Sequence, residues 1–316
     1  MENNKHNAGP PGDESRGYHV PVLLQEAIDG LNIQPGGVYV DGTFGGGGHA
    51  REILRRLSSE GRLYLFDQDE DARRNLPDDT RIHFFPHNFR HMQRFLRLHK
   101  VGPVDGVLAD LGVSSHQFDE PARGFSTRFD GDLDMRMDQR QSLTAFEVIH
   151  TYPEQRLHKI FEQYGEVTNA KTLAKKIVEV RQAMPLRTIA SFRHAIAEVV
   201  KGNPHKYLAQ VFQALRIEVN QELEALRDML TQLPALLKPG GRVAIITFHS
   251  LEDRLVKQFF KNGSFDDGQE NSDPFGQHTH AKLFRLINRK PIVPSAAEMT
   301  QNPRSRSARL RVAEKI

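Results

Sequence analysis

The sequence predicts an α/β fold in which a mostly parallel sheet carries helices on both faces and is interrupted by an inserted all-helical domain. Short apolar runs alternate with helical patterns from residue 36 to residue 112, which is typical of a parallel sheet covered on both sides. The pattern then changes to helical periodicity with little strand character, and strand-like runs return only after residue 236. This interruption indicates an insertion between two strands of one sheet.

The individual elements follow from local periodicity and from the glycines between them. Strands are predicted at 36–43, 62–69, 81–88, 104–112, 242–248, 282–288 and 309–314. Helices are predicted at 50–57, 89–100, 172–184 and 191–200, and a long amphipathic helix from about Ile217 leads into LLKPGG (236–241). We therefore expect a disordered tail at 1–17, a catalytic domain formed by 18–138 and 209–316, and an inserted helical substrate-binding domain at 139–208.

The composition excludes several classes of chemistry. The chain contains no cysteine, which removes disulfides, thiolate zinc sites and cysteine nucleophiles. No run approaches the roughly 18 apolar residues of a membrane span, and the polar N-terminus has no apolar leader segment. We expect a soluble, cytoplasmic protein with no membrane partner.

Positive charge is concentrated in two regions. Residues 282–316 include nine Lys/Arg against two Glu, and residues 139–208 include eleven Lys/Arg against six Glu. Neutralisation of phosphates by such side chains drives nucleic-acid binding, so a polyanion partner is favoured over the alternative of a solvated lysine-rich surface.

A glycine-rich loop follows the first predicted strand, in the segment DGTFGGGGHA (41–50). Glycines here let the backbone approach a ligand closely, and the helix that follows presents free amides to it. The spacing does not match the G-x-G-x-x-G pattern of dinucleotide sites, and no Lys-Ser/Thr pair follows as in a P-loop. The loop alone therefore indicates a nucleotide-like ligand without identifying it.

Three further residues stand at the ends of successive predicted strands. Asp67 lies 26 residues after Asp41, where a carboxylate can accept both hydroxyls of a ribose in either NAD or S-adenosylmethionine. Phe89 offers an aromatic edge for an adenine, and Asp110 stands at the mouth of the sheet. Because the glycine-rich loop and these three residues occur in the order that this fold requires, they favour a methyl-donor site over ordinary turns.

The chain resembles the small-subunit ribosomal RNA methyltransferase H family. The matching segments span nearly the whole chain and include RGFS (123–126). The most specific are DLGVSSHQ (110–117), DMRMD (134–138) and FHSLEDR (248–254). The resemblance implies a class I, Rossmann-like methyltransferase fold and an S-adenosylmethionine-dependent enzyme. It also implies that the methyl group goes to the exocyclic N4 of a decoding-centre cytidine in 16S ribosomal RNA.

The resemblance also implies site residues and partners. The residues implied to contact S-adenosylmethionine are Gly47, Gly48, His49, Asp67, Phe89, Asp110 and Gln117. The inserted helices are implied to hold the RNA, and the substrate is implied to be a largely assembled 30S subunit. A homodimer is compatible with the resemblance.

Methylation of N4 needs an acceptor for the amine hydrogens, because the nitrogen gathers positive charge as it is methylated. Asp110 and the carbonyl of Leu111 are the candidates, although Asp110 could instead serve only the methionine amine of the donor. His249 follows the fifth strand and is a second catalytic candidate. Next to it, Ser250-x-x-Asp253 predicts a helix capping box in which Ser250 is the cap.

Three residues are candidates for substrate contacts, each with a plainer alternative. Ser114 and Ser115 could position the target base, or could bond only to nearby backbone. Arg136 could hold a phosphate or the base, or could belong to a solvated loop. The aspartates at 130–138 resemble metal ligands, but Met135 stands at the position where a calcium loop needs glycine, so we expect no metal site.

Two other functions fit the sequence less well. An NAD-dependent oxidoreductase would have no role for the DLGVSS turn or the basic C-terminal region, and a non-catalytic RNA-binding protein would have no need for Asp67 and Asp110. Methylation at cytosine C5 ordinarily uses a cysteine nucleophile, which this chain lacks.

Overall fold

The computed structural model describes residues 21–265 and 282–316, so the tail predicted at 1–17 lies outside the described residues. Its centre is a seven-stranded sheet in the order β3-β2-β1-β4-β5-β7-β6. The strands are β1 Val38–Asp41, β2 Arg62–Phe66, β3 Ile82–Phe85, β4 Val104–Asp110, β5 Leu237–Thr247, β6 Phe284–Leu286 and β7 Arg309–Lys315. Strands β1 to β5 pair in parallel, whereas β7 runs antiparallel to both β5 and β6. The predicted mostly parallel sheet is confirmed.

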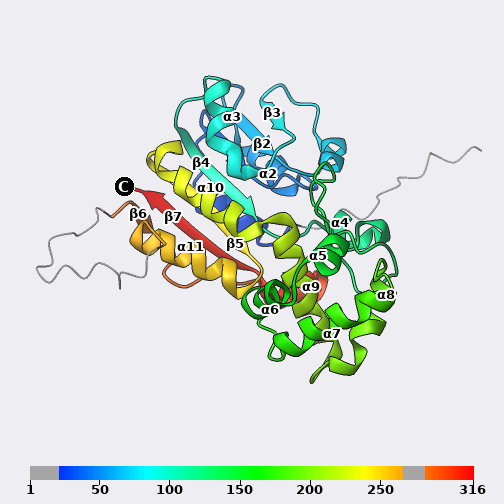
Figure 1. Cartoon of the computed structure of the whole chain (residues 1–316). Helices are drawn as coiled ribbons and strands as arrows, with labels where there is room; N and C mark the ends of the chain where they lie inside the picture. Colours follow the sequence, from blue (N-terminus) through cyan, green and yellow to red (C-terminus); the bar gives the residue numbers. More distant parts are fainter. Residues whose placement is uncertain (1–20, 266–281) are drawn as a thin grey trace, which may run out of the picture.

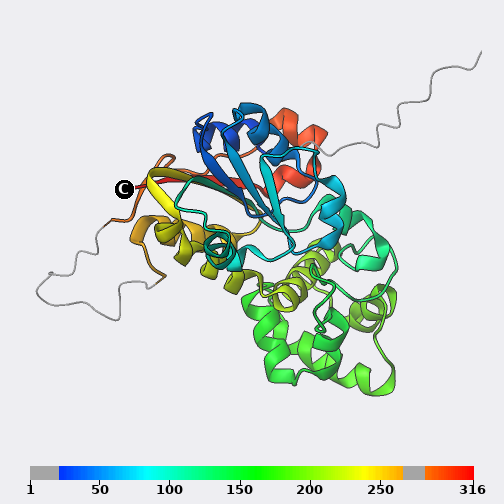
Figure 2. The same cartoon turned by 90° about the horizontal axis from the view of Figure 1, so that it is seen from above.

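Helices cover both faces of the sheet, as expected from its strands, which are apolar on both sides (Figure 1, Figure 2). One face packs against α1 Leu24–Leu31 and α2 Gly48–Arg56. The other packs against α3 Met92–Leu98, α10 Glu222–Leu236 and α11 Ser250–Asn262. Successive strand residues point to opposite faces, so Tyr39 belongs to the first layer and Val40 to the second.

The insertion between β4 and β5 is helical, as predicted. Its longer helices are α5 Ala145–Thr151, α6 Glu154–Gln163, α7 Ala170–Ala183, α8 Ile189–Ile196 and α9 Pro204–Asn220. They share a hydrophobic core of their own, which takes in residues from Phe125 to Val219 and therefore reaches beyond 139–208 on both sides. Figure 1 shows this group of helices beyond the arrowhead of β4.

Two local features differ from the sequence-based expectation. The helix expected from about Ile217 is divided, because Gln221 adopts a left-handed conformation with φ of 50° between α9 and α10. Strand β5 starts at Leu237 and not at Arg242 as predicted, and KPGG (238–241) lies where the register with β4 shifts, between the pairs Val104–Leu237 and Gly106–Arg242. The turn at Gln221 redirects the chain from the inserted helices back to the sheet.

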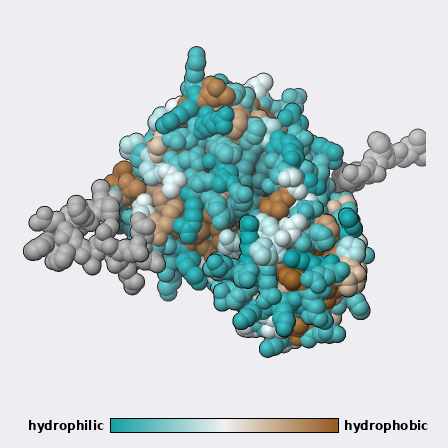
Figure 3. All heavy atoms as spheres, in the orientation of Figure 1, coloured by the Kyte–Doolittle hydropathy of each residue, from teal (hydrophilic) through white to brown (hydrophobic). Residues whose placement is uncertain are grey.

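The surface in Figure 3 is mainly hydrophilic, with hydrophobic side chains in small separate groups. Among residues 21–265 and 282–316, no helix combines the length and the apolar character needed to cross a membrane.

Candidate functional site

The glycine loop joins β1 to α2 and needs glycine at specific positions. Gly47 precedes the first turn of α2 with φ of 76°, a left-handed conformation that strains other residues. A Cβ atom on Gly48 would lie 2.0 Å from Cγ of Pro21, so any side chain there would displace Pro21. Gly46 differs, because a Cβ atom on it would meet nothing within 4 Å. The loop is therefore closely packed on one side and open at Gly46.

Asp67, just beyond the end of β2, holds this loop in place. Its Oδ2 accepts a hydrogen bond from the backbone of Gly45 at 2.7 Å, and its Oδ1 accepts one from the backbone of Asp69 at 2.8 Å. Burial raises the pKa of Asp67 to about 6, although these two hydrogen bonds act in the opposite direction. The carboxylate is thus fixed at the loop and is mainly ionised at neutral pH.

Asp69 connects the donor loop to the segments after β4. Its buried carboxylate accepts a hydrogen bond from Nε2 of Gln117 at 2.7 Å and lies 2.8 Å from Nη1 of Arg123. Gln117 belongs to the short helix α4 Ser115–Asp119, whose first turn is capped by Ser114. Gln117 is therefore held at the end of β2, although the two segments are far apart in sequence.

His49, in the first turn of α2, lies close to Asp110 at the end of β4. Nε2 of His49 lies 3.1 Å from the carbonyl of Val22, and Nδ1 lies 3.8 Å from Oδ2 of Asp110. Burial lowers the pKa of His49 to about 4, so the imidazole is neutral at pH 7 and does not form an ion pair with Asp110.

Asp110 itself has an unusual environment. Its backbone N–H donates to Oγ1 of Thr43 at 2.6 Å, which fixes the end of β4 against the donor loop. Burial, together with the charges of Asp41 and Glu252, raises the pKa of Asp110 well above its ordinary value. Its Oδ1 atom is buried and has no hydrogen-bond partner. A buried acceptor without a partner is costly, and it is well suited to bind a ligand N–H group.

Phe89 begins the short 3₁₀ turn Phe89–His91, close to the same loop. A Cβ atom on Gly42 would lie 3.3 Å from the Cβ of Phe89, which shows how closely the two backbones approach. The preceding Asn88 donates to the side chain of Gln68 at 2.8 Å. An aromatic side chain therefore lies next to the glycines and the residues that follow β2.

These residues from four strand ends form one site at the carboxyl edge of the sheet. In doubly wound sheets, ligands bind at this edge where the strand order reverses, which here lies between β1 and β4. A glycine cradle, an ionised carboxylate and an unpartnered acceptor fit a ligand that carries a ribose and an amine.

Comparison with known proteins identifies the family. The model of the MraW methylase family matches residues 16–316. The chain belongs to the MraW methylase family. It is a methyltransferase, and its methyl donor is S-adenosylmethionine.

Relatives agree with this assignment. A protein of Bacteroides thetaiotaomicron named ribosomal RNA small subunit methyltransferase H is 56% identical over 94% of this chain and 97% of its own length. A Bacteroides fragilis protein of the same name is 55% identical over 96% of this chain and 99% of its own length. A solved rRNA methylase from Streptococcus thermophilus is 11% identical over 94% of this chain and 97% of that chain, with a TM-score of 0.40, which is too weak a likeness to add to the argument.

Two of the three candidate substrate residues of this methyltransferase, Ser114 and Arg136, make side-chain bonds to nearby residues. Ser114 accepts from the backbone of Gln117 at 3.2 Å, and Ser115 is the first residue of α4. Arg136 pairs with Asp134 at 2.7 Å and donates to the carbonyls of Gln139 and Gln141. A contact with substrate remains a prediction for all three.

The predicted capping role of Ser250 is wrong. Helix α11 begins at Ser250, and its cap is His249, whose Nδ1 accepts from the backbone of Glu252 at 3.5 Å. Oε2 of Glu252 in turn accepts from the backbone N–H of His249 at 3.4 Å, and also from that of Phe248 at 2.8 Å. The reciprocal glutamate therefore lies at position 252, and the capping box begins one residue earlier than the sequence pattern suggested.

Two buried polar residues of this methyltransferase were not singled out in the sequence. Arg123 is 5% exposed and, besides Asp69, contacts the carbonyls of Arg136 and Met137. Asn220 accepts from the backbone of Met137 at 2.7 Å and donates to the carbonyl of Met135 at 2.8 Å. Arg123 thus connects the loop after α4 to Asp69 beside the sheet, and Asn220 connects the same loop to α9. Arg123 occurs in the segment RGFS (123–126), which was the only sequence signal for it.

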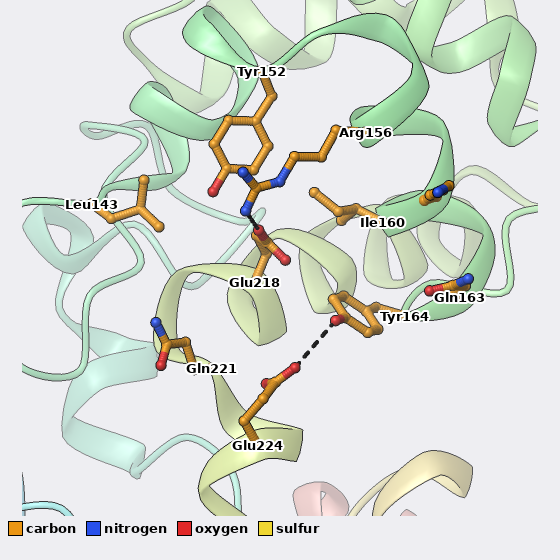
Figure 4. Close-up of a pocket in the computed structure, with 10 residues that line it drawn as sticks. Leu143, Tyr152, Arg156, Ile160, Gln163, Tyr164, Glu218, Gln221 and Glu224 are labelled. Carbon is orange, nitrogen blue, oxygen red and sulfur yellow. Dashed lines mark hydrogen bonds and ion pairs between the residues drawn. The ribbon is translucent and has the colours of Figure 1, made fainter.

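A second feature is an open pocket of about 420 Å³ between the inserted helices and the start of α10 (Figure 4). Tyr152 lies beside Arg156, whose guanidinium carbon is 3.7 Å from the ring centroid. Arg156 pairs with Glu218 at 2.7 Å, and the hydroxyl of Tyr164 lies 3.4 Å from Glu224. The lining thus combines aromatic faces with charges of both signs.

Proposed function

We propose that this methyltransferase transfers a methyl group to the exocyclic N4 of a decoding-centre cytidine in 16S ribosomal RNA. The observation that carries the proposal is Asp110 Oδ1, a buried acceptor without a partner at the end of β4. The names of the relatives supply the class of RNA, because both are called small-subunit ribosomal RNA methyltransferases. The absence of cysteine also argues against attack at cytosine C5.

The donor supplies an electrophilic methyl group on a sulfonium, and the glycine loop, Asp67, Phe89 and Gln117 would hold it. The chain must then make N4 nucleophilic. The N4 lone pair is delocalised into the ring and becomes available as the nitrogen pyramidalises and gains positive charge. Oδ1 of Asp110 accepts an N4–H bond and stabilises that charge.

Asp110 can also take up the proton that N4 must lose. The pKa of its carboxyl group is raised by burial and by the neighbouring Asp41 and Glu252, which makes the carboxylate a stronger base than an exposed aspartate. The carbonyl of Leu111 is a second acceptor for an N4–H bond. The alternative role of Asp110 is to bind only the methionine amine of the donor.

The inserted helices are the part that we propose to hold the RNA. Their pocket offers Tyr152 and Tyr164 for stacking and Arg156 and Lys159 for phosphate contacts. A largely assembled 30S subunit is the proposed substrate, and a homodimer stays a prediction.

The test is a mass-spectrometric analysis of ribosomal RNA nucleosides from cells with and without the protein. We expect N4-methylcytidine to be lost from small-subunit RNA without it and restored by the wild-type protein. Asp110→Asn should bind the donor normally and restore no methylation if Asp110 serves N4. Loss of donor binding in this variant would instead assign Asp110 to the methionine amine. An undiminished N4-methylcytidine level in cells lacking the protein would refute the proposed substrate.

A further inference from the structure

His249 lies where β5 ends, beside the strand that carries Asp110. Residues Asp110 and Ile246 are register partners in β4 and β5, and the backbone of Leu111 donates to the carbonyl of Ile246 at 3.0 Å. The His249 side chain is only 8% exposed. Both side chains therefore follow adjacent strands at the same edge of the sheet.

The hydrogen-bond state of these two side chains is unusual. Within residues 21–265 and 282–316, only two buried side-chain nitrogen or oxygen atoms have no hydrogen-bond partner, and they are Oδ1 of Asp110 and Nε2 of His249. Buried polar atoms are almost always paired in native proteins, so an unpaired atom needs an explanation such as a bound ligand. Here two such atoms occur on neighbouring strand ends.

The tautomer of His249 follows from its capping bond. Nδ1 accepts a hydrogen bond from the backbone N–H of Glu252, so Nδ1 carries the lone pair and the ring hydrogen is on Nε2. Nε2 lies 3.3 Å from Oε1 of Glu252, which is within ion-pair distance, and this contact helps to lower the pKa of Glu252, but it does not have the geometry of a hydrogen bond. The unpaired atom of His249 is therefore a donor, whereas that of Asp110 is an acceptor.

The same tautomer argues against a metal. Glu222, His249 and Glu252 bring their side-chain ligand atoms within 4.8 Å of one another, which is a spacing suited to a cation. A metal would need the lone pair of Nε2, and the capping bond places hydrogen there. Glu222 is also engaged by Arg216, with N–O distances of 2.8 and 3.0 Å.

A donor and an acceptor on neighbouring strand ends match one edge of cytosine. That base presents an N–H donor at N4 and an acceptor at N3, whereas uracil presents the opposite pattern at the same two positions. We propose that Nε2–H of His249 donates to N3 of the target cytosine while Oδ1 of Asp110 accepts from N4–H. The proposal rests on the proposed function and adds a residue that reads the base.

Glu252 is the positioning residue in this arrangement. Glu252 is 2% exposed, and its Oε2 accepts a hydrogen bond from the backbone N–H of Phe248. Its own backbone N–H donates to Nδ1 of His249 and so orients the imidazole ring. A hydrogen bond from His249 to N3 also withdraws electron density from the N4 amine. This hydrogen bond would therefore help the enzyme to recognise the base and align N4, and it would not make N4 more nucleophilic.

The experiment compares two substrates that differ at one atom. Small subunits are reconstituted with 16S RNA that carries either cytidine or 3-deazacytidine at the target position, because the second base has C–H in place of N3. The rate ratio between the two substrates is measured for wild type and for His249→Phe. Since the change in intrinsic amine reactivity is common to both proteins, it cancels when the two ratios are compared.

We expect the preference for cytidine over 3-deazacytidine to be about tenfold smaller in His249→Phe than in wild type, the fold-change of one hydrogen bond. His249→Gln keeps an N–H donor and should recover part of the preference. The matched control is His99→Phe, an exposed histidine outside the site, which should keep the wild-type ratio. Donor affinity measured by calorimetry reports whether each variant is folded.

Two results would overturn the proposal. One is an equal substrate ratio in wild type and His249→Phe while both proteins bind S-adenosylmethionine. The other is calorimetric binding of Zn²⁺ by wild type that is lost in His249→Phe, because Nε2 would then be a metal ligand. Failure of the wild type to methylate the cytidine substrate at all would refute the proposed function itself, and the assignment of His249 with it.

Discussion

The Nε2 of Gln117 donates a hydrogen bond of 2.7 Å to Oδ2 of Asp69, across 48 residues of sequence. The carboxylate of Asp69 also forms an ion pair with Arg123, and the backbone N–H of Asp69 donates a hydrogen bond to the carboxylate of Asp67. Asp67, which is predicted to bind the donor ribose, and the helix after β4 are therefore fixed to each other through the buried carboxylate of Asp69. Changes on either side of Asp69 should affect donor binding.

Substitution of Asp67 tests the ribose contact directly. Asp67→Ala removes the proposed acceptor of both hydroxyls and also the acceptor of the Gly45 N–H bond. Two charge-assisted hydrogen bonds of about 1.5 kcal/mol each correspond to a roughly 100-fold weaker affinity for S-adenosylmethionine. Calorimetry measures this, with Asp78→Ala, an exposed aspartate, as the control. Unchanged affinity in Asp67→Ala would refute the role of Asp67.

Donor affinity should depend on pH through the same carboxylate. Burial raises the pKa of Asp67 to about 6, and the ionised form is the one that is expected to accept the ribose hydroxyls. Protonation therefore competes with binding, so affinity should rise between pH 5 and pH 7 and fall by up to about tenfold per unit well below pH 6. In Asp67→Asn the step near pH 6 should be absent. A wild-type affinity that stays constant from pH 5 to pH 7 contradicts this assignment.

The glycine loop offers a matched pair of substitutions. Gly48→Ala places Cβ 2.0 Å from Pro21, whereas Gly46→Ala meets nothing within 4 Å. Overpacking of this kind costs about 1–3 kcal/mol, so Gly48→Ala should lower the melting temperature and weaken donor binding. Gly46→Ala should change neither by a comparable amount. Equal behaviour of the two variants in thermal unfolding and calorimetry would show that the loop is not packed as described.

Removal of Arg123 should be strongly destabilising. Arg123 is 5% exposed and is paired with Asp69, so Arg123→Met leaves a buried carboxylate without its cationic partner. Breaking such a pair costs about 3 kcal/mol or more in the free energy of unfolding. Urea unfolding measures this cost, with exposed Arg128→Met as the control. The double variant Arg123→Met, Asp69→Asn should regain part of the loss, and a neutral single variant would contradict the buried pair.

The sequence was sufficient to predict the sheet, the insertion and the donor loop, because these depend on periodicity and on local glycine patterns. It could not predict Arg123 or Asn220, since their importance comes from buried contacts with carbonyls and side chains distant in the chain. The assignment of Ser250 as a cap failed for a related reason. Both Ser250 and His249 can cap a helix, and the choice depends on where β5 ends, which periodicity locates only to within a residue or two.

The insertion has one further consequence. The insertion leaves the sheet at the carboxyl end of β4, at Asp110, and returns through the turn at Gln221 into α10, whose first residue, Glu222, lies near His249. Both of its connections therefore lie at the edge of the sheet that carries the candidate site, and α10 then runs back along the sheet to the start of β5. The inserted helices can thus change in length or sequence without altering the strand order or the positions of Asp110 and His249.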